Sequence, residues 1–95
     1  MLKDPFVGQA AVSRAGHDKG KAFVVTAVLD GGFVLISDGD SRKQDKPKKK
    51  KCMHLFDFPR KGRNGMEALM RGEQVTDAAI RKYLLTLAAA VEQDS

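Results

Sequence analysis

The spacing of apolar residues changes near residue 58, and this change divides the chain into two parts with different secondary structure. Before it, short apolar runs are separated by glycine, aspartate and other turn residues, which is typical of short β-strands. After it, apolar residues recur every three or four positions, which is typical of α-helices. A chain of 95 residues is long enough for one small domain. We therefore predict a β-barrel over residues 1–58 and, over 59–95, a linker and helices that pack on it as a single compact domain.

Short strands separated by turns are predicted throughout the first part. The longest, 22–29, is apolar on both faces, which indicates a central strand rather than one with a face open to water. Asp30, Gly31 and Gly32 make a tight connection, so residues 22–37 are predicted to form a β-hairpin. The predicted strands are 7–13, 22–29, 33–37, 41–43 and 52–56. Turns every eight to twelve residues or so favour a small barrel or sandwich.

Two helices are predicted in the second part. Asn64 is expected to cap a short helix that stops at Gly72. Thr76 or Asp77 is expected to cap a longer helix that runs to about residue 93, with Asp77 suited to the positive helix N-terminus. The apolar stripe of this helix contains Ile80, Leu84, Leu87 and Val91, flanked by Tyr83 and Ala90. Because such a stripe is normally part of a core, we expect it to pack on the barrel or the short helix rather than on a partner protein.

The positive charge is concentrated in the first part of the chain. The formal net charge is +5, which divides into +7 on residues 1–63 and −2 on residues 64–95. Seven cations and one anion lie within residues 42–51. Such a block repels itself and stays in solvent unless an anionic surface covers it. It is either a solubilising loop or a protected sheet edge, or it binds an acidic partner, most commonly nucleic acid.

Residue types that support catalysis or metal binding are sparse. Cys52, His54 and His17 are too few for a structural zinc site, which needs four ligands. Nothing beside Cys52 activates it as a nucleophile, so we predict a small buried residue. The chain has neither the spacing of a phosphate-binding P-loop nor paired carboxylates in an apolar setting. We therefore predict no cofactor, no metal, no small-molecule substrate and no enzymatic activity.

The sequence also suggests a compartment. No stretch approaches the roughly 20 apolar residues of a membrane span, and residues 1–5 lack the apolar character of a signal peptide. The single cysteine cannot form an internal disulfide, which agrees with a reducing environment. We expect a cytoplasmic protein without membrane contact, and the sequence leaves its oligomeric state open.

Several features in a fixed order resemble the KOW-type RNA-binding domain. In the run 13–21, a small residue, a basic polar loop and a glycine lead into the Val-rich strand 22–29. The further features are Ser37-Asp38-Gly39, Arg42-Lys43, the Lys-Pro-Lys-Lys-Lys-Lys run at 46–51, His54-Leu55 and the tail at 75–84. Over most of its length the chain is similar to small bacterial KOW-domain proteins related to an archaeal and eukaryotic large-subunit ribosomal protein family. It departs from them at His17, where relatives often have arginine, and at 56–63, which fits no family pattern.

The resemblance implies a mainly β fold with C-terminal α structure: an SH3-like five-stranded barrel, a short helix and a longer C-terminal helix. It also implies binding to structured RNA, namely rRNA or the ribosome. Because lysines are many and aromatic residues few, we expect recognition of folded RNA through its phosphate backbone. The predicted RNA-binding residues are Arg14, His17, Lys19 and Lys21 in one loop and Arg42, Lys43, Lys46, Lys48, Lys49, Lys50 and Lys51 in a second arm. Gly16, Gly20, Gly39 and Pro47 are predicted to shape these segments, with Pro47 holding the arm extended.

A second function stays open at this point, because KOW modules also bind proteins and a fold does not fix its partner. The alternative is an SH3-like protein–protein interaction module in translation or transcription, acting through a barrel groove or the C-terminal helix. Reversing the charges at 48–51 separates the two hypotheses. RNA binding should collapse, whereas a contact made by the helix should survive.

Overall fold

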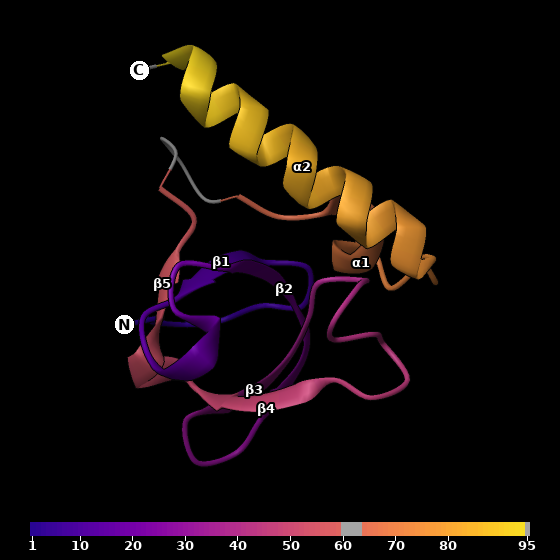
Figure 1. Ribbon diagram of the computed structural model, residues 1–95. Coiled ribbons are helices and arrows are strands. Elements are labelled where there is room, and N and C mark those ends of the chain that lie inside the picture. Colours follow the sequence, from indigo (N-terminus) through magenta and orange to yellow (C-terminus); the bar gives the residue numbers. More distant parts are fainter. Residues whose placement is uncertain (60–63, 95) are drawn as a thin grey trace.

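The computed structural model describes residues 1–59 and 64–94, which form a mainly β structure with a C-terminal helix (Figure 1). Five strands make one antiparallel sheet in the order β4-β3-β2-β1-β5. The strands are β1 (Ala10–Ser13), β2 (Ala22–Leu29), β3 (Phe33–Ser37), β4 (Lys48–Lys51) and β5 (Leu55–Asp57). Two 3₁₀ turns, η1 (Gly16–Asp18) and η2 (Cys52–His54), and two helices, α1 (Glu67–Met70) and α2 (Asp77–Asp94), complete the described elements.

The centre of the sheet is the strand that the sequence predicts to be central. β2 lies between β1 and β3, and Phe23, Val24 and Val25 are completely buried, so both of its faces are covered. The predicted hairpin is confirmed, since β2 and β3 pair from Leu29 opposite Phe33 onwards. The register shifts between Val25 and Ala27, which lets this long strand bend. One core cluster contains Leu2, Ala11, Phe23, Val25, Val34, Ile36, Cys52 and Leu55.

The sheet is open, so the prediction of a closed five-stranded barrel is wrong. β4 and β5 are its two edges, and no ladder joins them within residues 1–59 and 64–94. η2 is the tight turn between the two edge strands. Leu2 N donates to Cys52 O at 3.0 Å, and Arg14 N donates to His54 O at 2.9 Å. η2 is therefore bonded to the N-terminal segment and to the end of β1.

Three strand boundaries differ from the prediction. β1 begins at Ala10 rather than at residue 7, because Gly8 has a φ of +95° and breaks the extended path. Residues 41–43 form no strand, since the Asp38 carboxylate accepts from Arg42 N and curls the chain. The predicted strand at 52–56 begins as η2 and becomes extended at Leu55.

The lysine run is itself a strand, which corrects the prediction of a free, solvated arm. β4 pairs with β3 along its whole length, from Ile36 opposite Lys48 to Phe33 opposite Lys51. The ladder begins directly after Pro47, as expected for a residue without a backbone donor. The alternative interpretation of the run as a sheet edge is therefore correct.

The long helix has the predicted position and cap. Thr76 Oγ1 accepts a hydrogen bond from Ala79 N at 3.0 Å, and the helix begins at Asp77. The short helix is shorter than expected, because α1 begins only at Glu67, and Asn64 donates its Nδ2 to Phe58 O instead of capping it.

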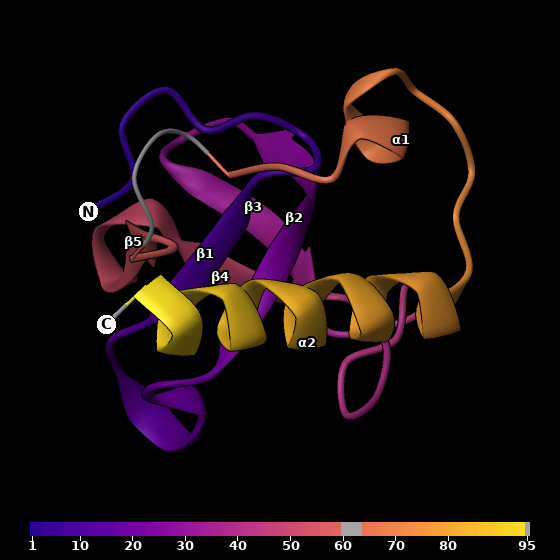
Figure 2. The same ribbon diagram turned by 90° about the horizontal axis from the view of Figure 1, so that it is seen from above.

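α2 lies across the sheet over β1 and β2 (Figure 2). Ile80 and Leu84 pack with Val24 and with Leu69 of α1, so the helix contacts both the sheet and the short helix. Leu87 packs with Ala10 and Phe58 in a further cluster. The predicted linker at 60–63 and the side chain of Val91 lie outside the described residues. No described helix is both long and apolar enough to cross a membrane.

Candidate nucleic-acid interface

The basic loop 14–21 is fixed to the lysine strand by two contacts. Lys48 Nζ lies 2.5 Å from Asp18 Oδ2, and the Asp18 side chain is only 7% exposed. Lys50 is also buried, and its Nζ donates to Ala15 O at 3.1 Å. Loop and strand therefore form one surface, although they are about 30 residues apart in the sequence.

Cations surround Asp18. The hydrogen bond from Lys48 lowers the pKa of Asp18 below its ordinary value, and this outweighs burial, which acts to raise it. The charges of Lys48, Arg42 and Lys21 lower the pKa further. Arg42 and Lys21 thus belong to the same electrostatic neighbourhood as Lys48. The buried carboxylate contacts Lys48 alone among these cations in the described part of the chain, while the charges of Arg42 and Lys21 act on it from farther away.

Asp18→Asn is expected to destabilise the protein by about 2 kcal/mol at neutral pH, because Lys48 loses its ion-pair partner. The loss is not larger because the Lys48 side chain stays partly in contact with water. Since folding lowers the pKa of Asp18, its stabilisation is complete above the ordinary value of 3.8 and is lost as the pH falls through the lower folded value. Urea denaturation from pH 7 to pH 2 checks this. The difference between wild type and variant should shrink toward the acid end, and a constant difference would contradict the role of the pair.

The four lysines of β4 divide into two pairs, because successive side chains of a strand point to opposite faces. Lys48 and Lys50 point to the loop and make the contacts just described. Lys49 and Lys51 are exposed, and their Nζ atoms lie 4.5 and 6.0 Å from the centre of the Phe33 ring. A cation over an aromatic face is held in place while it keeps its charge. Only the second pair is therefore available to an external anion.

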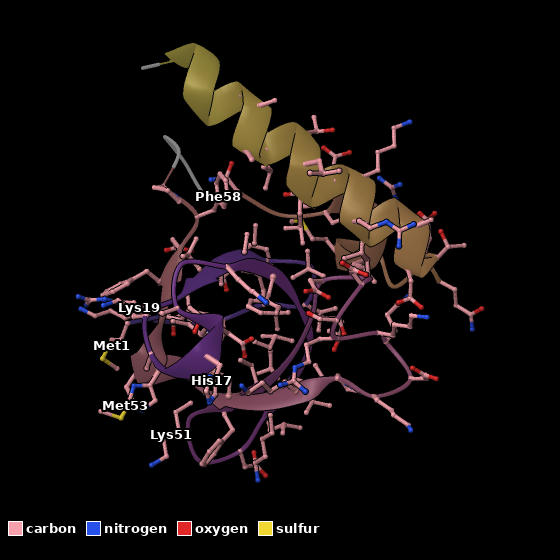
Figure 3. The ribbon with its side chains drawn as sticks, viewed as in Figure 1. Met1, His17, Lys19, Lys51, Met53 and Phe58 are labelled. Carbon is pink, nitrogen blue, oxygen red and sulfur yellow. The ribbon has the colours of Figure 1, made fainter. Side chains whose placement is uncertain are left out.

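Arg14 is held in the same way at the other edge of the sheet. Its guanidinium carbon lies 3.7 Å from the centre of the Phe56 ring, and the side chain is exposed. His17, Lys19 and Lys21 of the loop are exposed as well. Figure 3 shows His17, Lys19 and Lys51 toward one side of the molecule, away from α2.

The predicted second arm is divided between two places. Its later part is β4, whereas Lys43 and Lys46 are exposed on a loop that docks against the start of α2. Gln44 N donates to Asp77 Oδ1 at 3.0 Å, and Arg81 Nη1 donates to Gly39 O at 3.1 Å. This loop and loop 14–21 lie on opposite sides of the molecule in Figures 1 and 2. The structure thus brings the first loop and β4 together, with Arg42 close enough for its charge to act on Asp18, whereas Lys43 and Lys46 line a depression with Arg42 on the loop that docks against α2.

The residues predicted to shape these segments occupy turns or ends. Gly16, Gly20 and Gly39 have φ values of +75°, +87° and +76°, and Pro47 immediately precedes β4. The sequence interpretation missed Asp18, Phe33 and Phe56, which hold the cations in place. Strand alternation within the lysine run was the available signal for separating its two pairs.

Metal chemistry finds little support in the described part of the chain. There, no group of three or more histidine, cysteine, aspartate or glutamate side chains could hold a metal ion. Cys52 is 7% exposed and lies in the core cluster, in η2 rather than in a strand. The predicted burial is therefore confirmed.

Comparison with known proteins gives no family. No family model matches this chain, and no curated protein matches it. Its function is inferred from the surface just described.

Proposed function

We propose that this protein is a non-catalytic RNA-binding protein that recognises the phosphate backbone of structured RNA. The surface responsible, called here the basic face, consists of Arg14, His17, Lys19, Lys21, Arg42, Lys49 and Lys51. One observation carries the proposal: none of the cations in this group forms an ion pair with a carboxylate among residues 1–59 and 64–90. The acid that lies among them, Asp18, is paired with Lys48 instead.

Folded RNA is the anion that suits this surface best. A-form helices hide most base edges in a deep groove and present phosphates and 2′-hydroxyls, which proteins read by shape and charge. The basic face offers cations from separate segments, and aromatic rings hold three of them, Arg14, Lys49 and Lys51, as recognition of a phosphate path requires. Phe33 and Phe56 lie beneath cations and so support charges rather than present open stacking surfaces.

The same proposal assigns the chain to the KOW-type, SH3-like class and its target to rRNA or the ribosome. Two features support this assignment. The basic loop leads into a buried Val-rich strand, and η2 separates the two edge strands of the five-stranded antiparallel sheet. The resemblance in sequence covers the same segments. On this proposal the protein acts in the cytoplasm, where its RNA is found.

The proposal is tested by the salt dependence of binding to a fragment of rRNA. If about five cations neutralise phosphates, log K should fall with log salt at a slope of roughly −4. Lys19→Gln should weaken binding to all RNA helices alike and make the slope shallower by about one unit. Fluorescence anisotropy at several KCl concentrations measures both.

Lys82→Gln is the matched control, because Lys82 is an exposed lysine of α2, outside the basic face. It should leave affinity and slope unchanged. Equal effects of the two substitutions would indicate non-specific attraction by total charge. Absence of salt-sensitive binding by the wild type would overturn the proposal.

A further inference from the structure

Two cation–aromatic pairs on the basic face differ in a way that matters for recognition. Over Phe33 lie two lysines, whose ammonium groups are compact point charges. Over Phe56 lies Arg14, whose guanidinium is planar and can stack. The guanidinium carbon lies 3.7 Å from the ring centre, and Arg14 as a whole is exposed to solvent. The planar guanidinium of Arg14 can therefore stack with a second planar group.

An exposed apolar side chain belongs to the same neighbourhood. Met53 is 59% exposed and lies in η2, directly before His54, whose carbonyl accepts from Arg14 N. Figure 3 shows Met53 at the edge of the molecule, on the side where Lys19 and Lys51 are labelled. A large apolar side chain that is exposed to water is stabilised when a bound molecule covers it. The methionine side chain is flexible enough to fit the surface of that molecule.

From this juxtaposition we propose that Arg14, Phe56 and Met53 form a subsite for one unpaired RNA base. The base stacks on the side of the Arg14 guanidinium away from Phe56 and contacts the Met53 side chain. Neighbouring cations of the basic face hold the phosphates on either side of it. This inference rests on the proposed RNA-binding function and adds a preference for RNA in which a helix is interrupted by an unpaired nucleotide.

An unpaired nucleotide matches both the stacking surface of this subsite and the cations around it. It has flat faces that stack on arginine planes and apolar side chains, and it is always flanked by phosphates. A continuous duplex offers the phosphates but keeps its bases stacked on one another. The lysines over Phe33 lack a flat face, so that part of the surface suits backbone contact alone.

The test uses two RNA hairpins that differ only in one bulged nucleotide, which is 2-aminopurine. Wild-type protein should bind the bulged hairpin about tenfold more tightly than the paired one, and the fluorescence of the bulged base should change on binding. Arg14→Lys keeps the charge but removes the stacking plane. It should abolish the preference for the bulged hairpin and the fluorescence change, because the bulged hairpin loses more affinity than the paired one.

Arg42→Lys is the matched control, because it is the same substitution on the same face at an arginine that has no aromatic ring under its guanidinium within the described part of the chain. It should retain the preference. Met53→Gln should reduce the preference severalfold, and thermal melting verifies that each variant is folded. Equal binding of both hairpins by the wild type would overturn this inference and leave the proposed function standing. Equal losses for both hairpins in Arg14→Lys would also overturn it, and binding of neither hairpin would overturn the proposed function itself.

Discussion

Gly39→Ala should destabilise the protein by about 3 kcal/mol or more. Gly39 has a φ of +76°, which an L-residue with a side chain adopts at a cost of about 1–2 kcal/mol. A Cβ atom there would lie only 2.1 Å from the Asp77 carbonyl oxygen, too close for any contact. The backbone on both sides would have to move, and overpacking of this kind adds about 1–3 kcal/mol. The loop that begins at Gly39 would then separate from the start of α2.

Gly32→Ala is the matched control for this prediction. Gly32 has a similar φ of +81°, but a Cβ atom there would meet nothing within 4 Å. Gly32→Ala should therefore lower the free energy of unfolding only by the cost of the positive φ, about 1–2 kcal/mol. Urea denaturation followed by circular dichroism gives both free energies of unfolding. Equal losses at the two positions would contradict the close contact between Gly39 and Asp77.

The contact at Gly39 illustrates why part of this fold could not be predicted from the sequence. The Asp-Gly pair at 38–39 indicates a turn, and Asp77 beside Thr76 indicates the start of a helix, and both are correct. Nothing in either pattern indicates that the two meet. Gln44 N donates to Asp77 Oδ1 across 33 positions, and such a pairing depends on how the completed sheet and helix pack.

The correct predictions rest on local rules. The hairpin at 22–37 follows from two apolar runs joined by Asp-Gly-Gly, and α2 follows from its cap and its stripe of apolar residues. The barrel was predicted from strand spacing, which favours a barrel or a sandwich, and from the resemblance to the KOW-type domain. In the described residues the two edge strands do not pair with each other, and η2 lies between them with its backbone bonded to Leu2 and Arg14. Sequence spacing predicted five strands, but it placed one at 41–43 instead of 48–51 and did not determine how the edges end.

The candidate site was predicted in composition but not in arrangement. All of its cations were named, yet the lysine run was interpreted as one arm with equivalent residues. Its partition depends on Asp18, Ala15 and Phe33, which lie 16 to 35 positions from the lysines they contact. Lysine also has a low strand propensity, so a pattern-based interpretation favours a loop. Replacing all four lysines would therefore change binding and folding together, and the two pairs have to be tested separately.

Two double variants with the same composition and net charge make that separation. Lys49→Glu with Lys51→Glu should keep the fold, because both side chains are exposed, and should weaken RNA binding by at least about 100-fold through the loss of two charged contacts to phosphate. Lys48→Glu with Lys50→Glu should instead unfold the protein or lower its stability by about 5 kcal/mol. That change places a glutamate against buried Asp18 and leaves a buried carboxylate facing Ala15 O.

Thermal melting and RNA-binding titrations of both double variants measure the two effects. The first variant should melt close to the wild type, and the second should melt far below it or show no cooperative transition. Because total charge is identical, any difference between them arises from which face of β4 each lysine occupies. Equal stability of the two variants would contradict the described alternation of this strand. Full RNA binding by Lys49→Glu with Lys51→Glu would remove β4 from the interface and leave loop 14–21 and Arg42 as its only cations.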